Sequence, residues 1–201
     1  LITPPDIPAF EKQYNAGAFD LAYVNPYLIV ANPQKYQPLI RDAAPLKGIV
    51  VVAKDSPIQS LADLAGKEIA FPAPNALAAS LLIRAELSES HHLNFTPRYV
   101  NSHTATYLNV AQGLTAGGGG VQKTFNEQKE ATQALLRIIY TTPAVPSLPV
   151  AAHPRVPTTL QEKVRAAFLA LADTPNGKAL LGEIPMTRPI ATSAKDYEVL
   201  R

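Results

Sequence analysis

The sequence has 201 residues, of which 47% are hydrophobic and 17% charged, and its formal net charge is +2. A chain of this length can bury a substantial core as one large or two small domains. The scattered Lys and Arg residues argue against nucleic-acid binding, and the lack of cysteine excludes disulfides, thiol catalysis and Cys-type zinc sites.

The first predicted elements are short and alternate between helix and strand. Residues 8–18 predict a helix, because Phe10 and Tyr14 share one face. Residues 19–24 predict a buried strand. Residues 48–53 read GIVVVA, a continuously apolar run that is typical of a strand covered on both faces. Further strands are predicted at residues 36–40, 68–71, 96–100 and 135–140.

Helices are predicted between most of the later strands. Residues 76–88 are rich in Ala, Leu and Arg, which favour helix. Ser102 can cap a second helix that runs to about Gln112. Thr159 and Glu162 form a capping-box pattern that opens a third helix. This alternation favours an α/β fold with a mainly parallel sheet.

Two extended, proline-bearing segments, residues 53–60 and 141–151, resemble crossings between lobes. If they pair as a hinge, residues 1–52 and 145–201 form one discontinuous lobe and residues 53–144 form the other. This layout predicts a ligand site in a cleft between the lobes.

Five separated blocks of the sequence resemble one known family. They read GAFDLAYVNPY at 17–27, GIVVVAKDSPIQSLADLAGKEIAF at 48–71, YVNSHT at 99–104, YLNVAQGLTAGGGGV at 107–121 and VAAHPRVP at 150–157. In this order they resemble the periplasmic substrate-binding components of phosphate, phosphite and phosphonate ABC importers. The resemblance implies a type II periplasmic-binding-protein-like fold with two α/β lobes. It also implies a small anionic ligand, a membrane permease as partner, a monomeric receptor that catalyses nothing, and no cofactor.

The family normally opens with a strand and a helix that precede the block resembled by residues 8–23. The sequence begins at Leu1 without a match to that unit, so we expect the first strand–helix unit to be missing from it. A central sheet without that strand would expose an edge strand with unpaired backbone groups, which natural proteins usually avoid.

The segment 71–80, FPAPNALAAS, is the first candidate for anion binding. A strand ends, prolines turn the chain and a helix starts near Ala76, where unpartnered amides and the helix dipole favour an anion. The family usually carries Ser-Thr-Ser here, and the matching positions are Ala76, Leu77 and Ala78, preceded by Asn75. An ordinary strand-to-helix turn is the alternative interpretation.

A second helix start carries the residues Ser102, His103 and Thr104. The family's Ser-His pair matches the first two residue for residue. The resemblance therefore implies a ligand role, because an imidazole can donate to an anionic oxygen, more strongly when it is protonated. The alternative is a surface or structural histidine.

The resemblance also implies ligand contacts from a strand end near the start of the chain. It places Tyr23 and Asn25 where the family has an aromatic and a small polar group at the floor of the cleft. The alternative for Tyr23 is a core tyrosine, since tyrosines are often only partly buried.

The glycine run 117–120 invites comparison with a phosphate-binding loop. That motif needs Gly immediately before Lys, and Gln122 stands there, so nucleotide hydrolysis is disfavoured. The glycines instead allow close backbone approach to a ligand or a helix, with Gly118 and Gly119 as candidate ligand contacts. Ala116 replaces an Asp that often holds the ligand's far end in the family, which argues against an amine-bearing phosphonate.

Several functions remain open at this point. We predict a periplasmic receptor of an importer; the alternatives are a ligand-sensing module of a membrane signalling protein and an enzyme on the same fold. A transmembrane helix after Arg201 would favour the sensor. The enzyme is disfavoured because the sequence has no G-x-S-x-G or H-E-x-x-H motif. The sequence does not name the ligand.

Overall fold

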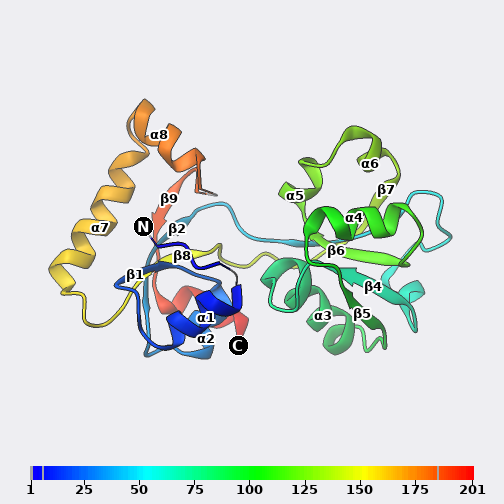
Figure 1. Cartoon of the computed structure of the whole chain (residues 1–201), viewed down its shortest axis with the longest axis horizontal. Coiled ribbons are helices and arrows are strands. Elements are labelled where there is room, and N and C mark those ends of the chain that lie inside the picture. The colour runs from blue at the N-terminus through cyan, green and yellow to red at the C-terminus, as the bar shows by residue number, and fades with distance from the viewer. Residues whose placement is uncertain (1, 6, 185) are drawn as a thin grey trace. The chain divides into compact units, whose positions relative to one another are not determined.

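A computed structural model describes residues 2–5, 7–184 and 186–201 (Figure 1). It divides the chain into two compact units, each with its own β-sheet and hydrophobic clusters. Unit 1 consists of Leu1–Pro45 and Val145–Arg201, and unit 2 consists of Leu46–Ala144. The chain therefore leaves unit 1 once and returns to it once.

Unit 1 is built on a four-stranded sheet in the order β1-β8-β2-β9. Its strands are β1 (Leu21–Tyr23), β2 (Gln37–Asp42), β8 (Pro149–Ala152) and β9 (Pro189–Ala191), and neighbours in the sheet pair antiparallel. Its helices are α1 (Ile7–Asn15), α2 (Pro26–Ala31), α7 (Thr158–Leu171), α8 (Pro175–Gly182) and the 3₁₀ helix η4 (Ala194–Leu200).

Aromatic rings fill part of the unit 1 core. Tyr14 stacks on Tyr36 with ring centroids 4.4 Å apart, and both side chains are buried. The Tyr36 hydroxyl donates to the Phe19 carbonyl at 2.8 Å, and His153 meets the Tyr36 ring edge-on. Because these contacts join both segments of unit 1, they stabilise its discontinuous arrangement.

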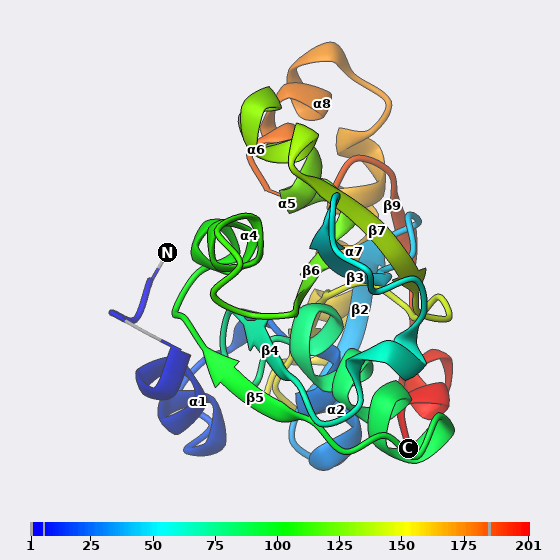
Figure 2. The same cartoon turned by 90° about the vertical axis from the view of Figure 1, so that its right-hand side faces the viewer.

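Unit 2 is built on a five-stranded mixed sheet in the order β5-β4-β6-β3-β7. Its strands are β3 (Gly48–Ala53), β4 (Glu68–Phe71), β5 (Thr96–Tyr99), β6 (Gly117–Val121) and β7 (Leu136–Thr141). β4 pairs parallel with β5 and β6, whereas β3 pairs antiparallel with β6 and β7. Figure 2 shows β4 and β5 side by side and the chain turning from β5 into α4.

The helices of unit 2 cover both faces of this sheet. They are η1 (Leu61–Leu64), η2 (Leu77–Leu82), α3 (Ile83–Ala85), η3 (Glu86–Ser90), α4 (His103–Ala111), α5 (Gln122–Asn126) and α6 (Glu130–Ala134). The elements η2, α3 and η3 follow one another directly, so residues 77–90 form one helical stretch. α4 and α3 lie on opposite sides of the sheet (Figure 1).

Glycines in β6 allow helices to approach from both sides. A Cβ at Gly118 would lie 2.8 Å from Thr106 and Val110 of α4. A Cβ at Gly119 would lie 2.1 Å from the Ala79 carbonyl of η2 and 2.7 Å from the Phe71 ring. Because successive residues of a strand face opposite sides, the run of glycines positions α4 on one face and η2 on the other.

The expectation of a mainly parallel sheet is wrong. The unit 1 pairings are antiparallel, and in unit 2 only β4 pairs parallel with its neighbours, β5 and β6. Helix–strand alternation predicts parallel pairing only where consecutive strands are joined by a crossover helix. β2 instead pairs with β8 and β9, which come from the distant second segment of unit 1.

The first boundary between the units also differs from the predicted one at residues 52 and 53. β3 belongs to unit 2, because it pairs with both β6 and β7. The predicted crossing at 53–60 is a loop of unit 2, where the Lys54 amide donates to the Leu135 carbonyl at 2.8 Å. An apolar strand looks the same in either lobe, so its pairing partners could not be read from its composition.

The predicted capping box at Thr159 is wrong as well. α7 begins at Thr158 with Pro157 in the N-cap position, so Thr159 lies inside the first turn. Proline favours the start of a helix because its fixed φ fits and its missing amide hydrogen is not needed there. The helix nevertheless runs to Leu171, as predicted.

Candidate anion-binding site

Two helix starts follow neighbouring parallel strands of unit 2. The chain leaves β4 at Phe71 and enters η2 at Leu77, and it leaves β5 at Tyr99 and enters α4 at His103. The two helices cover opposite faces of the sheet. In open α/β sheets, ligands bind outside the carboxyl ends of strands where the connections diverge in this way. The carboxyl edge of β4 and β5 is therefore the candidate site.

The η2 start offers backbone donors. Ala76 is its N-cap, with φ −68° and ψ 105°, and the Ser80 amide donates to the Ala76 carbonyl at 2.8 Å. The amides of residues 77–79 precede this first helical donor, so an anion can accept from them. Leu77 and Ala78 are buried, with only 8% and 3% of each whole residue exposed. These values include the backbone, so neither side chain reaches the surface, and the role of the amides of residues 77–79 as ligand donors stays a prediction.

Two glycines fix the η2 start against the sheet. The Ala78 carbonyl lies 2.2 Å from where a Cβ of Gly48 would be, and the Ala79 carbonyl lies 2.1 Å from that of Gly119. No residue with a side chain fits these two positions unless the helix shifts. Gly118 and Gly119 are both buried and surrounded by protein atoms, so packing explains them, and their ligand role stays a prediction.

The α4 start offers side-chain donors. Asn101 adopts a φ of +67°, a left-handed conformation that asparagine tolerates, and turns the chain from β5 toward the helix. Ser102 is the N-cap, and its Oγ accepts from the Ala105 amide at 3.0 Å. That bond uses a lone pair, so the hydroxyl hydrogen can be given to a ligand. Ser102 and Thr104 are exposed, and His103 is half-buried.

His103 is held by a residue that the sequence analysis missed. Its Nδ1 lies 3.3 Å from Thr124 Oγ1, which in turn lies 2.8 Å from the Tyr107 hydroxyl. Burial lowers the pKa of the His103 imidazole, and the Glu127 charge offsets part of that effect. Thr124 belongs to α5, and no motif in the sequence connects it with His103.

The structure places the remaining predicted residues as follows. Asn75 is exposed in the turn before η2. Tyr23 and Asn25 belong to unit 1. Burial, with a smaller contribution from the Asp42 charge, raises the pKa of Tyr23 to about 12. Asn25 is the N-cap of α2, where its Oδ1 accepts from the Tyr27 amide at 3.0 Å. Local structure explains Asn25, and the ligand roles of Tyr23 and Asn25 stay predictions.

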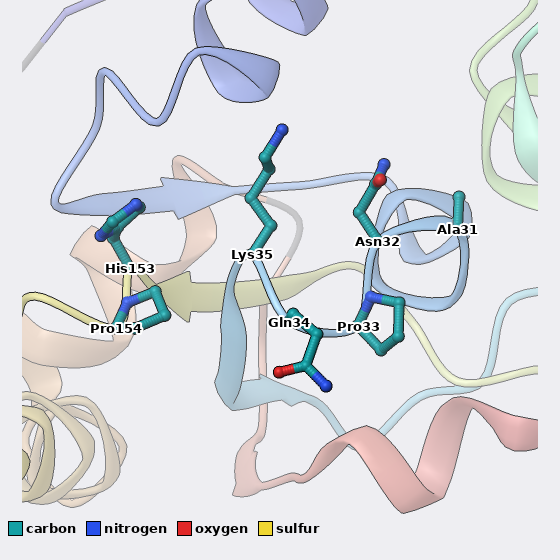
Figure 3. A pocket seen from close by; sticks show the side chains of 7 residues that line it. All are labelled: Ala31, Asn32, Pro33, Gln34, Lys35, His153 and Pro154. Carbon is teal, nitrogen blue, oxygen red and sulfur yellow. The ribbon is translucent and has the colours of Figure 1, made fainter.

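A hollow of about 470 Å³ lies in unit 1 (Figure 3). It is lined by Ala31, Asn32, Pro33, Gln34, Lys35, His153 and Pro154. The Lys35 ammonium also donates to the Asn15 carbonyl. None of the candidate ligand residues named from the sequence lines this hollow.

Residues 2–5, 7–184 and 186–201 contain no group of three or more His, Asp or Glu side chains placed to hold a metal ion. In the same part of the chain, no helix combines the length and apolar character needed to cross a membrane.

Three solved structures resemble this fold. A binding-protein component of an ABC phosphonate transporter from Pseudomonas aeruginosa matches with a TM-score of 0.77 and 15% identity, over 97% of this chain and 72% of that one. A Xanthomonas citri protein bound to ATP matches with a TM-score of 0.83 and 14% identity, over 100% and 85%. PhnD1 from Prochlorococcus marinus, in complex with methylphosphonate, matches with a TM-score of 0.79 and 16% identity, over 96% and 80%.

These similarities define the fold as that of two-lobed periplasmic binding proteins. The family model described as "ABC transporter, phosphonate, periplasmic substrate-binding protein" matches residues 1–197. The chain therefore belongs to the phosphonate-binding periplasmic protein family of ABC transporters. It is a substrate-binding component and not an enzyme, as the resemblance of the five sequence blocks implied.

Proposed function

We propose that the protein is a periplasmic receptor of an ABC importer that binds a small phosphonate- or phosphate-type anion at the carboxyl edge of β4 and β5. The observation that carries this proposal is the pair of helix starts that follow these two adjacent parallel strands. Family membership and the methylphosphonate held by the related PhnD1 support the choice of ligand class.

The donors at this edge differ in strength and in what they recognise. The amides at the start of η2 and the helix dipole attract any small anion. Ser102 can donate a directed hydrogen bond through its hydroxyl, and His103 adds a ring nitrogen. In the family's usual pattern, two or three more hydroxyls stand at the positions of Ala76, Leu77 and Ala78. Each absent hydroxyl forgoes about 1.5–3 kcal/mol if it would have bonded a charged oxygen, so we expect modest affinity for simple phosphonates.

We further propose that the receptor works as a monomer in the periplasm and delivers its ligand to a membrane permease. Family membership supports both the compartment and the permease. The net charge of +2 on 201 residues provides no strong field for a nucleic acid, so we propose none as a partner.

A thermal-shift panel tests the ligand class. Phosphate, phosphite, methylphosphonate, aminoethylphosphonate, sulfate and acetate are compared at equal ionic strength. A ligand at 100 times its dissociation constant adds about 2.7 kcal/mol of stability, which is readily measured. We expect stabilisation by at least one phosphorus oxyanion, and its loss in the double variant Ser102→Ala with His103→Ala. Stabilisation by acetate alone, or by none of the six, would exclude the proposed function.

A further inference from the structure

A hydrogen-bonded cluster lies next to Nδ1 of His103. It consists of the hydroxyls of Thr124 and Tyr107 and the Val121 carbonyl. The Thr124 hydroxyl lies 3.1 Å from the Val121 carbonyl, 2.8 Å from the Tyr107 hydroxyl and 3.3 Å from His103 Nδ1. The Tyr107 hydroxyl also lies 3.2 Å from the Val121 carbonyl. Tyr107 is fully buried and the cluster is only partly exposed, so these groups satisfy one another.

Counting the hydrogens decides which atom donates. Thr124 and Tyr107 have one hydroxyl hydrogen each, and the Val121 carbonyl can only accept. The two shortest contacts become hydrogen bonds if Tyr107 donates to Thr124 at 2.8 Å and Thr124 donates to Val121 at 3.1 Å, and the 3.2 Å contact from Tyr107 to Val121 is then unused. Thr124 can then only accept from His103, so Nδ1 must carry the hydrogen. If Thr124 donated to Nδ1 instead, it would give up its bond to Val121, and the cluster would hold one hydrogen bond fewer.

Burial favours the neutral form of the ring. Burial lowers the pKa of His103, and the charge of Glu127 opposes this only in part. The Glu127 carboxylate is 3.9 Å from the Lys123 ammonium on the same helical segment. This positive charge partly offsets the effect of Glu127 on the pKa of His103. A neutral ring with its hydrogen on Nδ1 carries a bare lone pair on Nε2.

We infer that Thr124 holds His103 with its hydrogen on Nδ1, so that Nε2 accepts a hydrogen bond from the ligand and the site selects an oxyanion that carries a proton over one that cannot. This inference rests on the proposed function, which places the ligand beside His103. The preferred ligand is the monoanion of a phosphonate or phosphate, whose P–OH hydrogen is donated to Nε2. A sulfonate of the same size brings only lone pairs to that nitrogen and is repelled by it.

The proton balance follows from this geometry. The second ionisation of a phosphoryl group falls near neutral pH, at about 6 for a phosphate ester, so monoanion and dianion coexist there. A dianion can enter the site only together with a proton from the solvent. That proton ends between the ligand oxygen and Nε2, and the complex holds one proton more than the neutral protein and the dianion together. Thr124 acts in this scheme as a positioning residue, because it touches His103 and not the ligand.

The first test reads the tautomer directly by ¹⁵N NMR of the ligand-free protein, with His103 assigned by comparison with His103→Gln. We expect the hydrogen on Nδ1 in the natural protein and in Thr124→Ser, which keeps the hydroxyl. In Thr124→Val we expect a mixture that includes the Nε2–H form. A ring of the natural protein that carries its hydrogen on Nε2 would overturn the inference whatever the ligand is.

The second test measures selection by calorimetry with methylphosphonate and methanesulfonate, in buffers of different ionisation enthalpy. We expect net proton uptake with methylphosphonate above its second pKa and a preference of about tenfold or more over methanesulfonate, the loss that one unmade hydrogen bond to a charged group brings. Thr124→Val should lose most of this preference, whereas Thr124→Ser and the exposed control Thr159→Val should keep it. Equal affinity for both ligands, or no proton uptake, would overturn the inference while leaving anion binding intact. Failure to bind either ligand would contradict the proposed function itself, and the selection with it.

Discussion

The two helix starts at the carboxyl edge of unit 2 differ in what they offer an anion. Both follow parallel strands, and both helices pack on β6 through glycines that lack the side chain to keep them away. η2 begins at Ala76 with backbone amides, whereas α4 begins at Ser102 and His103 with side chains that are exposed or half-buried. We therefore propose that attraction for anions in general comes from η2 and that discrimination among them comes from α4.

The largest effect on binding should come from removing the discriminating side chain. His103→Ala should weaken binding of the best phosphorus oxyanion by about 1.5–3 kcal/mol, the range for a hydrogen bond with a charged partner. Isothermal titration calorimetry measures the loss, and His92→Ala, in an exposed loop, is the matched control. Unchanged affinity in His103→Ala would show that this residue is not part of the site. It would also contradict the proposal that α4 discriminates among anions.

A second prediction concerns the start of η2, whose backbone a substitution in β6 should displace. Gly119→Ala places a Cβ 2.1 Å from the Ala79 carbonyl, so η2 must shift away from the sheet. We expect a loss of about 1–3 kcal/mol in the free energy of unfolding, as for other overpacked cores, and weaker anion binding as well. Urea denaturation and calorimetry give the two quantities.

The control for that experiment is Gly182→Ala, because an added Cβ there meets open space. It should leave anion affinity unchanged and stabilise α8 slightly. If Gly119→Ala lowers stability but binds the anion as tightly as before, the amides at the start of η2 are not part of the site.

A third, smaller effect should come from adding a side-chain donor to η2. Ala76 has the extended conformation of an N-cap residue, so Ala76→Ser should stabilise the protein by about 1 kcal/mol by capping the helix. It should also raise phosphonate affinity, because the serine hydroxyl can donate its hydrogen to the ligand while its oxygen accepts from a backbone amide at the start of η2. Ala78→Ser is the comparison: Ala78 as a whole is 3% exposed, so the added hydroxyl would be buried and stability should fall. A gain in affinity from Ala78→Ser and none from Ala76→Ser would reverse our assignment of the two positions.

The smallest expected effect is a dependence of stability on pH at the α4 start. Burial lowers the folded-state pKa of His103 below its value of about 6.5 in the unfolded chain. As the pH falls below that value, the unfolded chain takes up the proton first, so stability falls with pH until the folded-state pKa is also passed. His103→Gln should remove this slope from urea denaturation midpoints measured over that window. A slope of the same size in both proteins would show that other groups cause it.

Much of the fold could be predicted from local sequence. The apolar run at 48–53, the capped helix after Ser102 and the strand before residue 72 all occur as predicted, because burial, capping and proline turns act over a few residues. The pairing of β3 with β6 and β7 could not be predicted in the same way. It depends on which distant strands offer complementary edges, and an apolar strand fits several.

The candidate site was predictable to a similar extent. The helix starts at Ala76 and Ser102 were predicted from turn and capping residues, and the structure has both. The link from His103 to Thr124 could not be predicted, because a threonine 21 positions away carries no local signal until β6 and α5 bring it to the ring. The glycine run was predicted to allow close approach, and the structure shows helices as the groups that approach.

The most direct test of the central claim is amide NMR of the isotopically labelled protein titrated with methylphosphonate. We predict saturable shifts of the largest size at the amides of residues 77–79 and 102–104, the two helix starts of unit 2. The hollow of unit 1, lined by residues 31–35 and by His153, should show none of comparable size. Saturable shifts centred on that hollow, with the two helix starts unchanged, would contradict the account.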